Sequence, residues 1–226
     1  MTPDPAGRDP FSLLLYPMLT ERPTPPASVV AELAAAPLQK LAETERLQRA
    51  VVDSAGTAIV VAARGIADRM ARGGRVLTCG NGGSATSAAD LVADLASPDP
   101  PHRPLPGVCL SEDVSVISAI ANDVGFDEVF ARQVIAFGRR DDVLVVVSTS
   151  GNSANLVRAA TEARGRGLLT VGLSGDGGGR LATDGALDHC LTVPSSSVHR
   201  IQEVQTTVQH LLIEIIHRIL EGRACA

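Results

Sequence analysis

The chain has 226 residues, of which 45% are hydrophobic and 2% aromatic, enough apolar material for one large domain with a buried core. Its formal net charge of -5 argues against a nucleic-acid surface, which needs clustered cations. No apolar run approaches the roughly 20 residues of a membrane span, and the acidic, proline-containing N-terminal segment is unlike a signal peptide. We therefore expect a cytoplasmic protein that binds neither nucleic acid nor membrane.

The spacing of the cysteines also indicates in which cellular compartment the protein works. They are far apart, with no CxxC spacing, and so suggest neither a zinc knuckle nor a disulfide framework. Reduced thiols in the cytosol are the plain interpretation for Cys79, Cys109, Cys190 and Cys225.

The first part of the chain is predicted to be an arm followed by helices. Residues 1–27 are rich in proline and show no sustained period, which predicts a flexible arm. Residues 28–72 have a helical pattern, within which Pro37 and Gly56 predict a break or a joint. Two or three helices are therefore expected there, ended by the glycines at 73 and 74.

The spacing of apolar residues changes after residue 74. Short apolar, β-branched runs alternate with helical stretches, and this alternation predicts a parallel sheet covered on both faces. A long last helix is predicted over 197–221, so that residues 28–222 form one α/β domain. The predicted strands are 75–79, 107–111, 142–149, 168–174 and 189–194.

Two loops rich in Gly, Asn and Ser follow two of these strands. "CGNGGSATS" follows "RVLT", and "STSGNSANL" follows "DVLVVV". Glycine lets the backbone approach a ligand closely, and free amides at a helix start attract anions. Such residues are also common in caps and turns. Because ligands of open parallel sheets bind beyond the carboxyl ends of the strands, two such loops together favour a phosphate site.

Longer motifs carry a family resemblance. "GNGGS", "STSGNSANLVRAA" and "RIQEVQTTVQHLL" resemble the sugar isomerase (SIS) domain, and "AIANDVGFDEVFARQV" is similar to the phosphoheptose isomerase subfamily. The resemblance implies a three-layer α/β sandwich around a five-stranded parallel sheet, preceded by N-terminal helices. It also implies a homotetramer with active sites at subunit interfaces.

The resemblance implies an activity and a set of site residues. The reaction would isomerise a ketose phosphate, sedoheptulose 7-phosphate, to an aldose phosphate through an enediol, with a general base and an acid partner. Matching positions assign these roles to Asp94 and His210. A divalent ion, zinc in some members, would be bound by Asp90, Asp94, Gln202 and His210, with no organic cofactor. The substrate would contact Asn81, Gly82, Ser84, Asn122, Asp123, Ser148, Thr149, Ser150, Ser153 and Gln202.

The reacting end of this site departs from the family pattern. Asp90 and Asp94 stand where the family has His and Glu, Pro98 replaces an Arg, and His199 replaces an Asp. Misplacing a catalytic group by about 1 Å can cost roughly 100-fold in rate. The alternatives are therefore a non-catalytic tetrameric SIS protein, like the replication-initiator-associating protein, or a sugar-phosphate-binding regulator. The aspartates could then simply face solvent, and His210 could be a core histidine.

Overall fold

The computed structural model describes residues 26–224, and the chain divides into two units, Met1–Glu43 and Thr44–Ala226. The second unit carries the sheet and every candidate site residue. The predicted flexible arm, residues 1–27, lies almost wholly outside the described residues. The division between the units falls at residue 44, whereas the sequence placed the start of the domain at residue 28.

The N-terminal helical region is one helix, α2 (Pro26–Ala71), with Pro37 inside it. The prediction of two or three helices was therefore wrong. Proline removes one helical hydrogen bond, but strong helix formers such as Ala, Leu, Glu and Lys surround it and favour continuation. The predicted end is confirmed: Gly73 has φ 86°, and the amides of Gly73 and Gly74 donate to Met70 and Arg69 carbonyls. This pattern is a Schellman cap, which requires a left-handed residue.

The sheet has five parallel strands in the order β2-β1-β3-β4-β5. The predicted five-stranded parallel sheet is confirmed, with strand ends shifted by one or two residues. The strands are β1 (Val76–Gly80), β2 (Gly107–Cys109), β3 (Val143–Val147), β4 (Leu169–Gly175) and β5 (His189–Val193). The helices after α2 are α3 (Gly83–Ala96), α4 (Val114–Asp123), α5 (Val129–Phe137), α6 (Ala154–Gly165), α7 (Gly179–Thr183) and α8 (Val198–Ala224), with 3-10 turns at Phe126–Glu128 and Asp176–Gly178.

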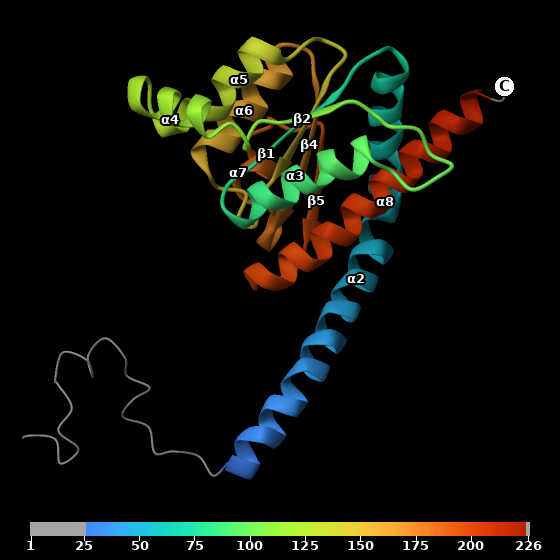
Figure 1. The fold of residues 1–226 in the computed structure, drawn as a ribbon, viewed down its shortest axis with the longest axis vertical. Helices are drawn as coiled ribbons and strands as arrows, with labels where there is room; N and C mark the ends of the chain where they lie inside the picture. Colours follow the sequence, from blue (N-terminus) through green and yellow to red (C-terminus); the bar gives the residue numbers. More distant parts are fainter. Residues whose placement is uncertain (1–25, 225–226) are drawn as a thin grey trace, which may run out of the picture. The chain divides into compact units, whose positions relative to one another are not determined.

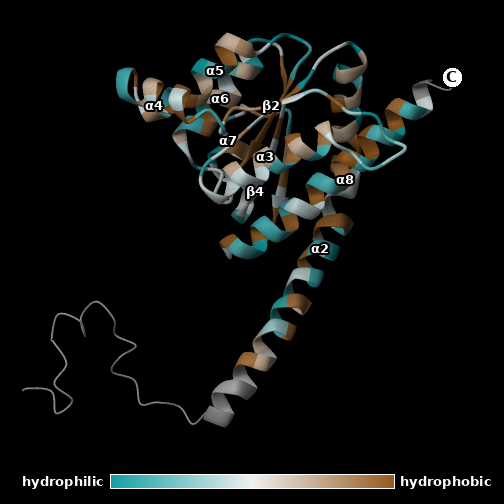
Figure 2. Cartoon of the chain, viewed as in Figure 1, coloured by the Kyte–Doolittle hydropathy of each residue, from teal (hydrophilic) through white to brown (hydrophobic). Residues whose placement is uncertain are grey.

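Helices cover both faces of the sheet, which gives the expected three layers (Figure 1). Alternate residues of a strand point to opposite faces: in β3, Val143, Val145 and Val147 pack with α3, α8 and the C-terminal part of α2. Leu144 and Val146 pack instead with α5, α6 and α7. The strands appear as the brown, hydrophobic centre in Figure 2, while α8 alternates brown and teal along its length.

One helical stretch passes a simple test for a membrane span, although the sequence led us to expect none. Within the described residues, Ala36–Ala71 is long and apolar enough to cross a membrane by length and composition, with 33% of its apolar window buried. Core helices of soluble proteins pass the same test. The buried residues of this helix, including Ile59, Ala63 and Ile66, belong to the core under the sheet.

The packing of the core predicts that shortening one buried side chain of the central strand lowers the stability of the protein strongly. Leu144 is fully buried in β3, so Leu144→Ala should lower the free energy of unfolding by about 2–5 kcal/mol through lost burial and a residual cavity. Urea denaturation followed by circular dichroism measures this. Val114→Ala is the matched control, because Val114 is 74% exposed and should change stability by no more than about 0.5 kcal/mol. Equal effects of the two variants would contradict this packing.

Candidate active site

The two glycine- and serine-rich loops lie side by side at the carboxyl edge of the sheet. β1 and β3 are parallel neighbours, with Gly80 paired to Val147 at their ends. Each strand leads through its loop into a helix, α3 after β1 and α6 after β3. The side-chain amides of Asn81 and Asn155 join the loops by two reciprocal hydrogen bonds, of 2.9 and 3.0 Å. The predicted convergence of the loops is therefore present in the structure.

The loops enclose a small cavity of about 90 Å³. Since a water molecule occupies about 30 Å³ in the liquid, this space suits an anion of a few atoms such as a phosphate group. Its lining contains six of the predicted substrate-binding residues together with two apolar ones: Asn81, Ser84, Val147, Ser148, Thr149, Ser150, Ser153 and Leu156. Gly82, also predicted, is the N-cap of α3, with φ 55°.

The hydroxyls in this cavity are not equivalent. Ser148 accepts a hydrogen bond from the Gly151 amide at 2.9 Å, and Ser150 accepts one from the Asn152 amide at 3.3 Å. Ser153 is the N-cap of α6 but makes no side-chain capping bond. Gly151 has φ 67°, and a Cβ there would lie 1.9 Å from the Gly178 carbonyl, so only glycine fits. The loop is thus held by its own contacts, and the Ser153 hydroxyl can be offered to a ligand.

Helix α8 contacts both loops with two glutamines less than one turn apart. A Cβ on Gly83 would lie 2.4 Å from Nε2 of Gln202, so α8 packs closely against the start of α3, and a side chain at residue 83 would displace the Gln202 amide. Gln205 is buried and donates from Nε2 to the Ser148 carbonyl at 2.7 Å. These contacts place α8 across the starts of both loops.

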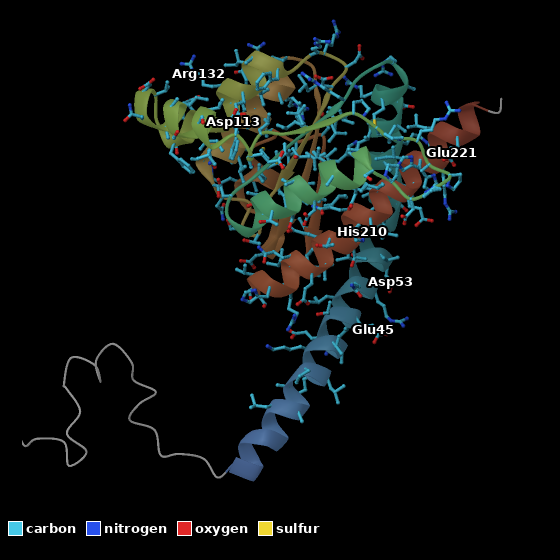
Figure 3. All side chains as sticks on the ribbon, viewed as in Figure 1. Glu45, Asp53, Asp113, Arg132, His210 and Glu221 are labelled. Atoms are coloured by element: carbon cyan, nitrogen blue, oxygen red, sulfur yellow. The ribbon has the colours of Figure 1, made fainter. Side chains whose placement is uncertain are left out.

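The same crossing brings together the two predicted catalytic residues. His210 Nε2 lies 3.5 Å from Oδ2 of Asp94, and their side chains are 64% and 47% exposed. His210 projects from the middle of α8 (Figure 3). The pair lies at a second cavity, of about 390 Å³, lined by Asp94, Ser97, Pro98, Asp99, His102, His210, Ile213, Glu214 and His217. A carboxylate and an imidazole this close to each other can both exchange protons with a group bound beside them.

The structure does not bring every predicted residue to these cavities. Asn122 and Asp123, at the end of α4, are exposed and bonded to each other at 2.8 Å, and they line neither cavity. Asp90 is exposed one turn before Asp94, and neither it nor Gln202 is a lining residue. Of the replaced positions, Pro98 lies at the Asp94 cavity and His199 is exposed at the start of α8.

The predicted metal set was therefore tested against the geometry. Among the described residues, the group of three or more His, Cys, Asp or Glu side chains whose donor atoms converge within 4.8 Å is His102, His217 and Glu221. Asp90, Asp94 and His210 do not form such a group, because Asp90 faces solvent. The donor atoms of Asp90, Asp94 and His210 therefore do not converge on one point in this structure, and no chemical step below depends on a metal there.

Several residues at the site were missed by the sequence analysis. His102 lies in the proline-rich connection 97–106 after α3, and His217 lies on the apolar face of α8, where spacing alone suggests core packing. Gln205 is likewise inside a helical run and becomes informative only through its bond to Ser148. Only the crossing of α8 over α3 brings these residues to the site.

The cysteines of the described part of the chain are free thiols. Cys79, Cys109 and Cys190 form no disulfide, while Cys225 lies outside the described residues. Burial raises the pKa of the Cys79 thiol, helped by Cys109, and burial also raises the pKa of Cys190. Both thiols are therefore protonated at neutral pH and are poor nucleophiles.

The five-stranded sheet and the paired serine-rich loops define an SIS-domain protein, and the SIS domain family model matches residues 41–175. A phosphoheptose isomerase from a Roseiflexus species is 42% identical over 77% of this chain and 88% of its own. That of Rhodospirillum rubrum is 44% identical over 72% of this chain and 86% of its own. The solved phosphoheptose isomerase of Francisella tularensis aligns with a TM-score of 0.77 and 32% identity, covering 82% of this chain and 98% of its own. The chain belongs to the phosphoheptose isomerase family of SIS-domain proteins.

The geometry of the loop cavity predicts that the Ser153 hydroxyl contributes to phosphate binding. Ser153→Ala should weaken inorganic phosphate binding about tenfold to hundredfold, the effect of losing one hydrogen bond to a charged group. The fold should be unaffected, because the Ser153 side chain makes no capping bond. Phosphorus NMR titration measures the affinity. Ser118→Ala is the control, since the exposed Ser118 hydroxyl bonds only the Ser115 carbonyl of α4. Unchanged phosphate affinity in Ser153→Ala would remove this residue from the site.

Proposed function

We propose that the protein isomerises sedoheptulose 7-phosphate to the corresponding heptose 7-phosphate. Three features of the chain support this: the loop cavity that suits a phosphate, the Asp94–His210 pair, and membership of a family whose relatives are named phosphoheptose isomerases. The single observation that carries the proposal is the 3.5 Å approach of His210 to Asp94, because it supplies a proton-transfer pair at a position where the family pattern is altered.

The distance between the two ends of the site supports a long sugar chain. Asp94 lies ten residues after Ser84 on α3, which is about 15 Å of helix rise. Helical side chains lean toward the N-terminus, so the carboxylate points back toward the phosphate loop. In sedoheptulose 7-phosphate the reacting C1 and C2 lie at the opposite end of the chain from the phosphate. A base three turns along the helix therefore suits a substrate of this length better than a short sugar phosphate.

The proposed steps use the two side chains in turn. The Asp94 carboxylate takes a proton from C1, the electron pair forms the C1–C2 double bond, and the C2 carbonyl oxygen takes a proton from the His210 imidazolium. The enediol then returns its O1 proton to the imidazole, the C1 carbonyl forms, and C2 takes the proton from Asp94. An imidazole is suited to both transfers because it can gain or lose a proton near neutral pH.

The replacement of Glu by Asp at position 94 is accommodated by the approach of His210. The aspartate side chain is one methylene shorter, so the carboxylate stays nearer α3, and His210 reaches it from α8. Pro98, in place of an arginine, lines the same cavity and adds no charge to it. The proposed acid–base pair thus consists of one carboxylate and one imidazole. The connection after α3 forms one wall of the cavity in which they lie.

We further infer a homotetramer acting in the cytoplasm. Apolar side chains on the described part of α2 remain exposed in the single chain, among them Val52, Val60 and Val61 at 47%, 43% and 50%. The Asp94–His210 pair is also open to solvent, whereas proton abstraction from carbon benefits from exclusion of water. Packing of further copies over these faces would cover both. The free thiols support a reducing compartment.

The catalytic assignment predicts a separation of turnover from binding. Asp94→Asn should lower kcat by at least about 100-fold with little change in substrate affinity, because only the proton transfer is removed. His210→Ala should act similarly. A coupled assay of aldose formation measures kcat, and calorimetry with sedoheptulose 7-phosphate measures affinity. Glu214→Gln is the matched control, since Glu214 lines the same cavity from α8 but has no assigned role. Wild-type turnover in Asp94→Asn would place the base elsewhere.

The proposed homotetramer can be tested by measuring the mass of the protein in solution. Multi-angle light scattering at micromolar concentration should give about four times the 23.4 kDa chain mass. Val60→Glu with Val61→Glu should lower that mass, since buried unpaired carboxylates in an interface are costly. A monomer mass for the wild-type protein would contradict the assembly while leaving the fold untouched.

A further inference from the structure

A cluster of titratable side chains at the far end of the Asp94 cavity has no part in the proposed reaction. His102 and His217 stack with ring centroids 4.5 Å apart and an interplanar angle of 18°. His102 Nδ1 lies 2.6 Å from a Glu221 carboxylate oxygen. The donor atoms of all three residues lie within 4.8 Å of one another. Two imidazoles and one carboxylate therefore converge on one point.

The cluster contains a buried ring nitrogen that has no hydrogen-bond partner among the described residues. His217 is 2% exposed, and among the described residues its Nε2 finds no hydrogen-bond partner. A buried polar atom left unpaired is costly, and its presence in a native structure needs an explanation, such as a bound water or ion. Burial lowers the pKa of His217, with the neighbouring His102 adding to the effect and Glu221 opposing it.

We propose that His102, His217 and Glu221 form a binding site for a divalent transition-metal ion of the zinc class. Two histidines and one glutamate are a common three-ligand set for zinc, which leaves a fourth position for water. An ion would give the unpaired Nε2 of His217 a partner. The ion would also hold all three side chains together. The existing hydrogen bond to Glu221 holds only His102, and His217 merely stacks on His102.

This site is separate from the residues that the family pattern assigns to a metal. Those are Asp90 and Asp94 on α3, and Gln202 and His210 near the start and middle of α8. His217 and Glu221 are two to three turns further along that helix, and Figure 3 shows Glu221 well toward the C-terminus from His210. The new site uses none of the four, so the two can be tested independently.

The chain segments that supply the ligands suggest what the ion does. His217 and Glu221 are four residues apart on α8 and share one face, whereas His102 comes from the connection 97–106 that follows α3. Pro98 and Asp99 of that connection line the Asp94 cavity. A bound ion would clip the connection to α8 and fix this wall of the cavity. The ion would thus position this wall of the cavity, and the proton transfers of the proposed reaction would stay with Asp94 and His210.

Metal binding by the full-length protein tests the site directly. After dialysis against a chelator and then buffer, calorimetric titration with zinc chloride should show one ion per chain, and zinc should raise the thermal midpoint. His102→Ala and His217→Ala should weaken zinc binding by at least about 100-fold, since loss of even an outer-shell partner costs about 10–100-fold. Cobalt should give the visible absorption of a four-coordinate site in the wild type and lose it in both variants.

Three further variants keep the test decisive. Glu221→Gln removes a ligand at a half-exposed position, so it should weaken zinc binding without the folding risk of replacing buried His217. His199→Ala, an exposed histidine of the same helix outside the cluster, should bind zinc as the wild type does. His210→Ala should also keep its zinc. Absence of zinc binding by the wild type would overturn the proposal, as would wild-type binding by Glu221→Gln and His217→Ala, or loss of the ion in His210→Ala alone.

Discussion

The close crossing of α8 over the start of α3 determines most of the site. The amide of Gln202 lies against Gly83 and would have to shift if that residue carried a side chain. Three residues further along α8, Gln205 bonds the carbonyl of Ser148 in the other loop. One helix is thereby fixed against both phosphate loops. From that contact the rest of α8 follows the direction of α3, which is why His210 arrives beside Asp94 and His217 beside the connection that follows α3.

The two ends of the site are built in different ways. The phosphate end is made of backbone and short side chains at two strand ends, and the Asn81–Asn155 amide pair ties them together. The reacting end depends on longer side chains from two crossing helices, with Asp94 and His210 still open to solvent in one chain. The departures from the family pattern that the sequence resemblance implies lie at the second end. A carboxylate shortened by one methylene can be matched there by a partner from α8, whereas the packed loop around Gly151 leaves no such freedom.

The fold and the phosphate loops could be predicted because they depend on local signals. Alternating β-branched runs and helical stretches predicted five parallel strands, and the positions of "GNGGS" and "STSGNS" after two strands predicted their meeting. The single α2 helix was missed because Pro37 was taken to break a pattern that its helix-forming neighbours continue. His102, His217 and Gln205 were missed because their roles depend on which helices cross, and no spacing within the chain contains that information. Asn122 and Asp123 match a motif yet lie apart from both cavities, since a motif does not by itself give a position in space.

The central claim is that Asp94 and His210 transfer protons at the far end of a phosphate-anchored sugar. Incubation of the protein with sedoheptulose 7-phosphate in deuterium oxide tests it most directly, with deuterium at C1 followed by NMR. Transfer of the C1 proton to Asp94, followed by its exchange with solvent deuterons, predicts that the wild-type protein incorporates deuterium at C1 and that Asp94→Asn, still binding the sugar phosphate, does not. Incorporation by Asp94→Asn at the wild-type rate would contradict this assignment. A wild-type protein that binds the sugar phosphate but neither exchanges C1 nor forms aldose would contradict the isomerase function itself.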